Sequence, residues 1–443
     1  IVLFSGLQDG DLLLNGSVRS AQNVSVQALG GSITVNSPAR IEGLTLEALA
    51  KESSLLRTSV ETILRGKVIG SGLMTGQNLV IFETDDVLLT ELLTDAGNIE
   101  VHAGGAIELI KVDATKGFDI ELEAGDEITS NDILPDFNIR ADHLTASAGG
   151  GIAFVSDINS LTADTSAAGD IVVTNIGGQL SPLFLNHVES FNGRIEINTD
   201  GNITAGEVIS KTSAAGNTIT LRTRQLFGGN IIVDRVNAGS LGDVLLEAGG
   251  LNLGGALTFG GTITSDGAGT GRVSARQLTV LAGGFPAYPL MEVINLRTDV
   301  QDLIARALTG GNPTEKSVPG SESRADIVID EANDIRLRRV ETIFGDITVT
   351  AGGEIVHQAV RTPNRDITLV AGGSISAQLD EALSDGVALL PAKLFGRDLN
   401  VTAQNDITIN TTVNRMVVES LNVGDITITE SDSALFESIL SED

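Results

Sequence analysis

The stretch Gly345-Asp-Ile-Thr-Val-Thr-Ala-Gly-Gly-Glu-Ile355 decides the fold, because close relatives of it recur along the chain. Inside it, Ile347 and Val349 alternate with polar residues at a period of two, which predicts a short β-strand. The flanking Asp and Gly residues tolerate the sharp turns that end such a strand. Close copies are Gly97–Ile107, Gly242–Leu251 and Arg365–Ile375, and looser ones are Gly169–Leu180, Gly193–Ile203, Gly216–Thr223, Asp326–Ile335, Gly396–Ile407 and Gly424–Thr429.

The spacing of these copies is typical of a stacked solenoid. Their first apolar residues follow one another at steps of 20 to 27 residues: Ile99, Ile120, Leu144, Ile171, Ile195, Ile219 and Val244, then Ile327, Ile347 and Ile367. One coil reads as a strand at Ile335–Leu337, a step through Val340 and Ile343, a turn at Gly345-Asp346, a strand at Ile347–Val349 and a third short strand at Ile355. We therefore expect an all-β fold, a right-handed parallel β-helix of about 20–25 residues per coil.

The repeat pattern stops between Phe285 and Ala325. A helical period appears there, with a capping box at Thr298 and Gln301 and a stop at Gly310. The residues on the expected helix face are Val300, Leu303, Ile304, Ala307 and Leu308. We therefore expect a parallel β-helix over residues 1–284, a helix-containing insertion over 285–325 and a continued β-helix over 326–443.

The composition of the chain limits the classes of partner that it can bind. With 28 Lys and Arg against 58 Asp and Glu, the net charge of −30 disfavours nucleic acid and anionic membranes. No apolar run is long enough to span a bilayer, so no membrane insertion is expected. The chain has no cysteine, which excludes disulfides. We expect no cofactor, and calcium binding by outward carboxylates is the alternative that the acidic charge leaves open.

A search for catalytic chemistry assigns no catalytic, cofactor-binding or metal residue. Asn198-Thr199-Asp200-Gly201 resembles the Asn-Thr-Asp strand end of polygalacturonases, but the Asp-Asp pair that this family needs lies upstream, at Asp85-Asp86, and its Gly-His-Gly is missing. We interpret Asn198–Gly201 as a repeat corner. The four histidines, His102, His143, His187 and His357, have no metal-ligand spacing, and His102 is expected to point into solvent. The sequence does not predict an enzyme.

The phrase Gly-Asp-Ile-x-Val-x-Ala-Gly-Gly-x-Ile is similar to the repeats of filamentous haemagglutinin-like large exoproteins, which bacteria secrete through two-partner or autotransporter routes. This resemblance implies an extracellular or cell-surface β-helix with roles in adhesion, surface coating or fibre formation. We expect a non-enzymatic rod or fibre segment. The first and last repeats lack obvious polar caps, so we expect self-association or continuation into a longer chain.

Three alternatives remain open. The chain can be the subunit of a self-assembling extracellular filament. It can be a polysaccharide-active β-helix enzyme, which would need carboxylates stacked on adjacent coils around a groove. It can also be an adhesin that binds a glycan or a surface receptor through Phe285–Ala325.

Overall fold

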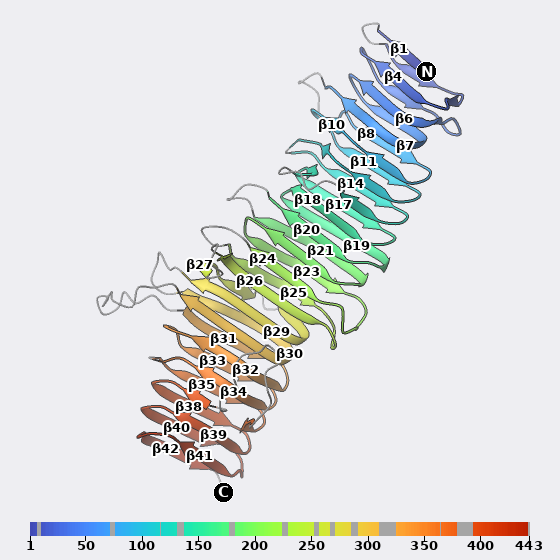
Figure 1. Cartoon of the computed structure of the whole chain (residues 1–443). Coiled ribbons are helices and arrows are strands. Elements are labelled where there is room, and N and C mark those ends of the chain that lie inside the picture. Colours follow the sequence, from blue (N-terminus) through green and yellow to red (C-terminus); the bar gives the residue numbers. More distant parts are fainter. Residues whose placement is uncertain are drawn as a thin grey trace. The chain divides into compact units, whose positions relative to one another are not determined.

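The structure is a computed structural model that describes residues 1–6, 10–70, 76–115, 117–130, 137–176, 182–223, 229–251, 257–265, 271–284, 291–309, 325–363, 365–378 and 393–441. These residues divide into two compact units, Ile1–Asp200 and Gly201–Asp443. Each unit is a stack of strands without a helix in its described part, so the expected all-β parallel β-helix is confirmed (Figure 1). None of the described segments forms a helix that could cross a membrane.

The first unit contains 22 described strands, most of them three to ten residues long. They are β1 Val2–Ser5, β2 Leu12–Leu14, β3 Val18–Arg19, β4 Asn23–Ala28, β5 Ile33–Val35, β6 Ile41–Ala50, β7 Ser54–Val68, β8 Leu79–Glu83, β9 Val87–Leu89, β10 Leu92–Thr94, β11 Ile99–Ala103, β12 Ile107–Leu109, β13 Val112–Asp113, β14 Ile120–Ala124, β15 Ile128–Ser130, β16 Ile139–Arg140, β17 His143–Ala148, β18 Ile152–Asp157, β19 Ser160–Ala168, β20 Ile171–Asn175, β21 Leu183–Asn192 and β22 Ile195–Thr199.

The second unit contains 20 described strands. They are β23 Ile203–Ser210, β24 Ile219–Thr223, β25 Ile231–Asn237, β26 Asp243–Leu251, β27 Leu257–Gly260, β28 Ile263–Ser265, β29 Arg272–Gly284, β30 Met291–Thr309, β31 Ala325–Glu331, β32 Ile335–Thr342, β33 Ile347–Ala351, β34 Ile355–Arg361, β35 Ile367–Ala371, β36 Ile375–Ala377, β37 Lys393–Phe395, β38 Asp398–Ala403, β39 Ile407–Thr412, β40 Arg415–Ser420, β41 Ile426–Glu430 and β42 Leu435–Ser441.

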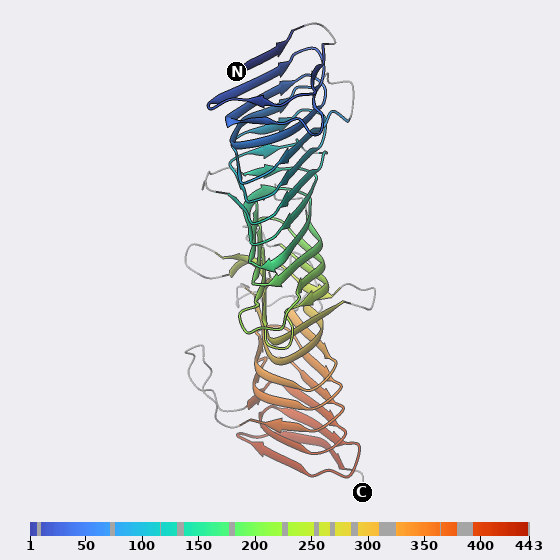
Figure 2. The same cartoon turned by 90° about the vertical axis from the view of Figure 1, so that its right-hand side faces the viewer.

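Three walls make up each coil of the second unit. One wall is built from β31, β33, β35, β38 and β40, and each strand pairs in parallel with the next. The strands β32 and β34 bend in the middle, so each supplies the other two walls of its coil. Figure 2 shows the strands of each unit lying one above another. The described strands of this unit pair in parallel, except that β26 and β27 form an antiparallel pair.

The core of each unit is a set of aliphatic columns. Ile327, Ile347 and Ile367 occupy the same place in three successive coils, and none of them is exposed. The alternation of buried and outward residues within each strand is the period-two pattern that the sequence shows. Since each inward side chain packs on its counterparts above and below, the core is narrow and continuous within a unit.

The structure corrects two details of the repeat. Leu144 pairs with Leu161, only 17 positions later, whereas Ile171 pairs with Ile152 and Ile195. The expected step from Leu144 to Ile171 therefore joins two different walls. Ile355 pairs with Ile335, so it begins the next coil, and the third wall of the coil is the second half of β32.

The expected helix at residues 298–310 is wrong, because Met291–Thr309 form the strand β30. Val300 and Leu303 are both buried, and the exposed Gln301 and the buried Asp302 separate them at a bend. Two residues, rather than one, separate Val300 from Leu303 at this bend. Apolar residues three positions apart are also typical of one face of a helix, so the sequence pattern resembles that of a helix. The remainder of the expected insertion, residues 285–290 and 310–324, lies outside the described residues.

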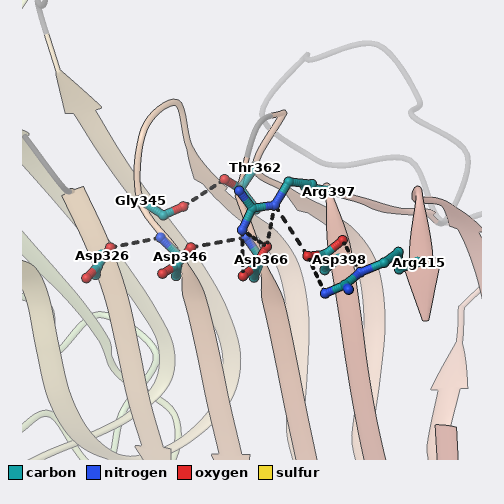
Figure 3. A network of polar contacts seen from close by, with 8 residues as sticks. All are labelled: Asp326, Gly345, Asp346, Thr362, Asp366, Arg397, Asp398 and Arg415. Carbon is teal, nitrogen blue, oxygen red and sulfur yellow. Dashed lines mark hydrogen bonds and ion pairs between the residues drawn. The ribbon is translucent and has the colours of Figure 1, made fainter. Parts of the chain in front are cut away.

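A ladder of carboxylates and amides runs along the corners that precede the strands. In the second unit the Asp346 N–H donates to Asp326 Oδ1 at 2.8 Å, and the Asp366 N–H donates to Asp346 Oδ1 at 3.1 Å (Figure 3). These are the Asp residues of the Gly-Asp-Ile phrase. Each carboxylate thus satisfies a backbone donor of the next coil, which fixes the corner where the chain turns into a strand.

Candidate functional site

The candidate functional site is a groove on the outer face of the first unit, with a cavity volume of about 200 Å³. It is lined by Asn78, Asn98, Ile99, Glu100, Asp119, Ile120, Glu121, His143 and Thr145. This volume is below the roughly 300 Å³ at which drug-sized sites begin, so the groove has room for one small group.

Strand register places the polar side chains of the groove in two columns. Glu100, Glu121 and Thr145 pair across β11, β14 and β17. The corner residues form the other column, where the Asn98 N–H donates to Asn78 Oδ1 at 3.1 Å and the Asp119 N–H donates to Asn98 Oδ1 at 3.0 Å. The sequence folds this way because short strands of five or six residues follow similar corners.

A third column of interacting side chains borders the groove. Arg57 lies over the ring of Phe82 at 4.7 Å, and Phe82 stacks on His102 with ring centroids 4.9 Å apart. His102 contacts two carboxylates, with Nε2 2.5 Å from Glu100 Oε1 and Nδ1 2.6 Å from Glu123 Oε2. The prediction that His102 points outward is confirmed, but its side chain is only 24% exposed.

The charge state of His102 follows from these contacts. Partial burial lowers its pKa, but the hydrogen bonds and charges of Glu100 and Glu123 outweigh burial, so the pKa is raised above the usual value. Both ring nitrogens then donate, which the protonated imidazole alone can do. When His102 is protonated, the column is therefore an ion-paired network that includes Glu100 and Glu123.

The groove is suited to hydroxyl-rich or cationic ligands. Three carboxylates, from Glu100, Asp119 and Glu121, meet two amides and the Thr145 hydroxyl there. These groups accept and donate hydrogen bonds in the way that sugar hydroxyls require. In the described part of the chain, no set of three or more His, Asp or Glu side chains is arranged to hold a metal ion.

Of the residues that the sequence raises as candidates for chemistry, His143 alone lines this groove. Its Nδ1 contacts the Ser160 hydroxyl, and its Nε2 lies 3.6 Å from Asp142 Oδ2. His187 lies in β21, and His357 is fully buried in β34. The histidines therefore occupy separate environments.

The two motifs that resembled a polygalacturonase are parts of the scaffold. Asn198 and Thr199 are buried at the end of β22, and the Asp200 N–H donates to the Asn175 carbonyl at 3.1 Å. Asp86 belongs to a corner ladder, where its Oδ1 accepts the Ala106 N–H at 2.8 Å. Asp85 Oδ2 accepts the Ser59 hydroxyl at 3.3 Å.

Two buried glutamates hold equivalent places in the two units. Glu83 Oε2 accepts the Val60 N–H at 3.0 Å, and Glu331 Oε2 accepts the Val300 N–H at 3.0 Å. Burial raises the pKa of both carboxyls, although these hydrogen bonds lower it. Most other coils carry Ala at this position, as at Ala103. We interpret both glutamates as structural, because they satisfy backbone donors at long bent strands.

Sequence reasoning missed the groove because its residues are far apart in the chain. Glu100 and Glu121, like His102 and Glu123, are separated by the 21 residues of one coil. If the outward residues of successive coils are aligned at this separation of 21 residues, the side chains that line the groove fall next to one another. Comparison of the chain with protein-family models, with curated proteins and with solved structures finds no match in any of the three.

Proposed function

We propose that this chain is a non-enzymatic structural protein, a β-helical rod or fibre segment at the bacterial surface, as the resemblance to filamentous haemagglutinin-like exoproteins implies. The observation that carries the proposal is the repetition of matched columns inside and outside each unit. Ile327, Ile347 and Ile367 repeat in the core, and Asp326, Asp346 and Asp366 repeat at the corner. Such stacking stiffens a coil against its neighbours and leaves the outer walls free to vary.

Electron microscopy of the purified chain, combined with polysaccharide depolymerisation assays, tests this proposal. We expect elongated particles and no turnover on neutral or acidic polysaccharides. Compact particles, or saturable depolymerisation that disappears in the Glu121→Gln variant, would contradict it. The Glu61→Gln variant is the matched control, because Glu61 is an exposed carboxylate of β7 outside the groove.

Self-association is a second proposal, and exposed apolar residues favour it. In β1, Val2 and Phe4 are exposed, and in β42, Leu435, Phe436 and Ile439 are exposed. In the described part of the chain, β1 pairs with β4 alone and β42 pairs with β40 alone. A strand with an unpaired backbone edge and apolar side chains is a template for another strand, which either a second copy of this chain or a further coil of a longer chain would supply.

Sedimentation velocity over a hundredfold concentration range tests self-association. We expect larger species at high concentration, and we expect Phe436→Lys to reduce them because it places a charge on the exposed rung. Exclusively monomeric behaviour up to about 100 μM, where an association with a micromolar Kd would be nearly complete, would refute the proposal.

A saccharide-binding role for the groove is a third proposal. Carboxylates stacked on adjacent coils around a groove are what a polysaccharide-active protein of this fold needs, and Glu100 and Glu121 meet that description. Glycan-array binding tests it, with Glu121→Gln expected to weaken any bound glycan and Glu61→Gln expected to leave it unchanged. Equal binding by both variants would remove the groove from consideration.

A further inference from the structure

We propose that an arginine cluster on the second unit binds a small oxyanion, namely a carboxylate, sulfate or phosphate group. The arginine cluster consists of Arg306 in β30, Arg336, Arg338 and Arg339 in β32, and Arg361 in β34. Register brings these strands together, because Asp302 pairs with Arg336, Arg306 pairs with Glu341, and Glu341 pairs with Arg361. The cluster therefore spans three successive coils of one unit.

Positive charge is concentrated at this place. Among the described residues, two carboxylates contact the cluster, and each is shared between two arginines. Asp302 contacts Arg336 Nε at 2.8 Å and Arg338 Nη2 at 3.1 Å. Glu341 contacts Arg339 Nη2 at 2.9 Å and Arg306 Nε at 3.4 Å. Five guanidinium groups thus gather around these two carboxylates, in a chain whose net charge is −30.

Donors in the cluster are also unsatisfied. The Nε atoms of Arg338 and Arg339 are buried and have no hydrogen-bond acceptor among the described residues. Arg306 Nε has none of good geometry either, although it lies within ion-pair distance of Glu341. A buried donor without an acceptor is destabilising, and gathering like charges adds to this cost. An anion with several oxygens would correct both defects.

The cluster remains open to a ligand. The side chains of Arg338 and Arg339 are 20% and 17% exposed, whereas that of Asp302 is 6% exposed. Asp302 is thus the more covered of the two carboxylates, since Glu341 is 16% exposed, and part of the Arg338 and Arg339 side chains reaches solvent. A guanidinium fork matches the two oxygens of a carboxylate or of one edge of a sulfate or phosphate. Because the whole chain is strongly acidic, it repels long polyanions, and we infer a small anion or a single acidic group.

The test measures binding of sulfate, phosphate and galacturonate to the whole chain by calorimetry, at constant ionic strength set with sodium chloride. We expect saturable binding of at least one of the three anions. Comparing them shows whether the cluster prefers a sulfate, a phosphate or a carboxylate group. Arg338→Gln should weaken that Kd about tenfold or more, which is the usual effect of losing a charged hydrogen bond. Arg338→Lys, which keeps the charge and loses the fork, should also weaken it.

Arg276→Gln is the matched control, because Arg276 makes one ion pair, with Asp243 Oδ2 at 2.6 Å, and lies outside the cluster. We expect the Arg276→Gln variant to bind the anion with the same Kd as the unchanged chain. Circular dichroism of each variant establishes that it is folded, and Arg339→Gln provides a second variant if Arg338→Gln is not. Absence of saturable binding by all three anions, or equal loss in Arg276→Gln and Arg338→Gln, would overturn the proposal. Tighter binding of an oligonucleotide than of the small anions would overturn the assigned ligand class.

Discussion

His357 should make the second unit sensitive to acid. Its side chain is fully buried in β34, and neither ring nitrogen has a hydrogen-bond partner among the residues that the structure describes. Burial alone lowers its pKa from 6.5 to about 4. The unfolded chain therefore takes up this proton at a higher pH than the folded chain does. The stability linked to His357 is present above pH 6.5 and is lost as the pH falls towards 4.

The size of this effect follows from the shift. One pKa unit corresponds to about 1.4 kcal/mol, so acidification from pH 6.5 to pH 4 should cost about 3 kcal/mol of unfolding free energy. His357→Leu should abolish the loss, because β34 places His357 between Leu337 and Ala377, where an aliphatic side chain fits the core column. At pH 7.5 the variant should be at least as stable as the unchanged chain, since it buries no unpaired nitrogen.

The assay is urea denaturation followed by circular dichroism at several pH values between 7.5 and 4. The buried carboxyls Glu83 and Glu331 have raised pKa values and titrate with the opposite sign, but they are present in both proteins and cancel in the difference. Ile355→Val is the control, since it should lower stability by about 1 kcal/mol at every pH. Parallel pH curves for His357→Leu and the unchanged chain would refute the reasoning.

Three further substitutions probe the corners and the His102 column. Asp346→Ala removes the acceptor of the Asp366 N–H and should cost about 1–2 kcal/mol, measured by urea denaturation, whereas no change would show that water replaces the carboxylate. His102→Gln should remove a stabilisation that is present below pH 6.5 and is lost as pH rises through the raised pKa of His102; an unchanged profile between pH 6 and 9 would contradict it. Gly97→Ala places a Cβ against the Gln77 carbonyl oxygen and should destabilise the first unit by about 1–3 kcal/mol in thermal unfolding, and full stability would show that the corner can shift.

The sequence was sufficient for the fold wherever a corner is marked by Asp or Asn before an aliphatic strand. Ile327, Ile347 and Ile367 are examples, and their predicted alignment is confirmed. It failed where the length of a coil changes. Leu161 follows Leu144 after only 17 positions, which is shorter than the other steps, so the spacing does not predict the strand β19.

The bend in β30 explains why the sequence predicts a helix where the structure has a strand. A one-residue phase shift inside a strand and one turn of helix produce the same spacing of apolar residues, and the capping box at Thr298 strengthened the error. In the structure Thr298 is a buried residue of β30 that pairs with Glu331 of β31. The groove and the arginine cluster were out of reach without the register, because both join residues from different coils.

The corner ladders have a consequence for how such a chain changes over generations. Neighbouring coils differ widely in length, since Leu144 and Leu161 are 17 positions apart while Ile294 pairs with Ile327, yet the strands beyond each corner return to the same register. Each Asp or Asn at a corner aligns its own coil with the next one by a local hydrogen bond, so an insertion at one corner does not propagate to the others. Residues can therefore be added or lost between strands, and whole coils duplicated, while the surrounding contacts stay as they were. The number and decoration of coils can vary under selection independently of the scaffold.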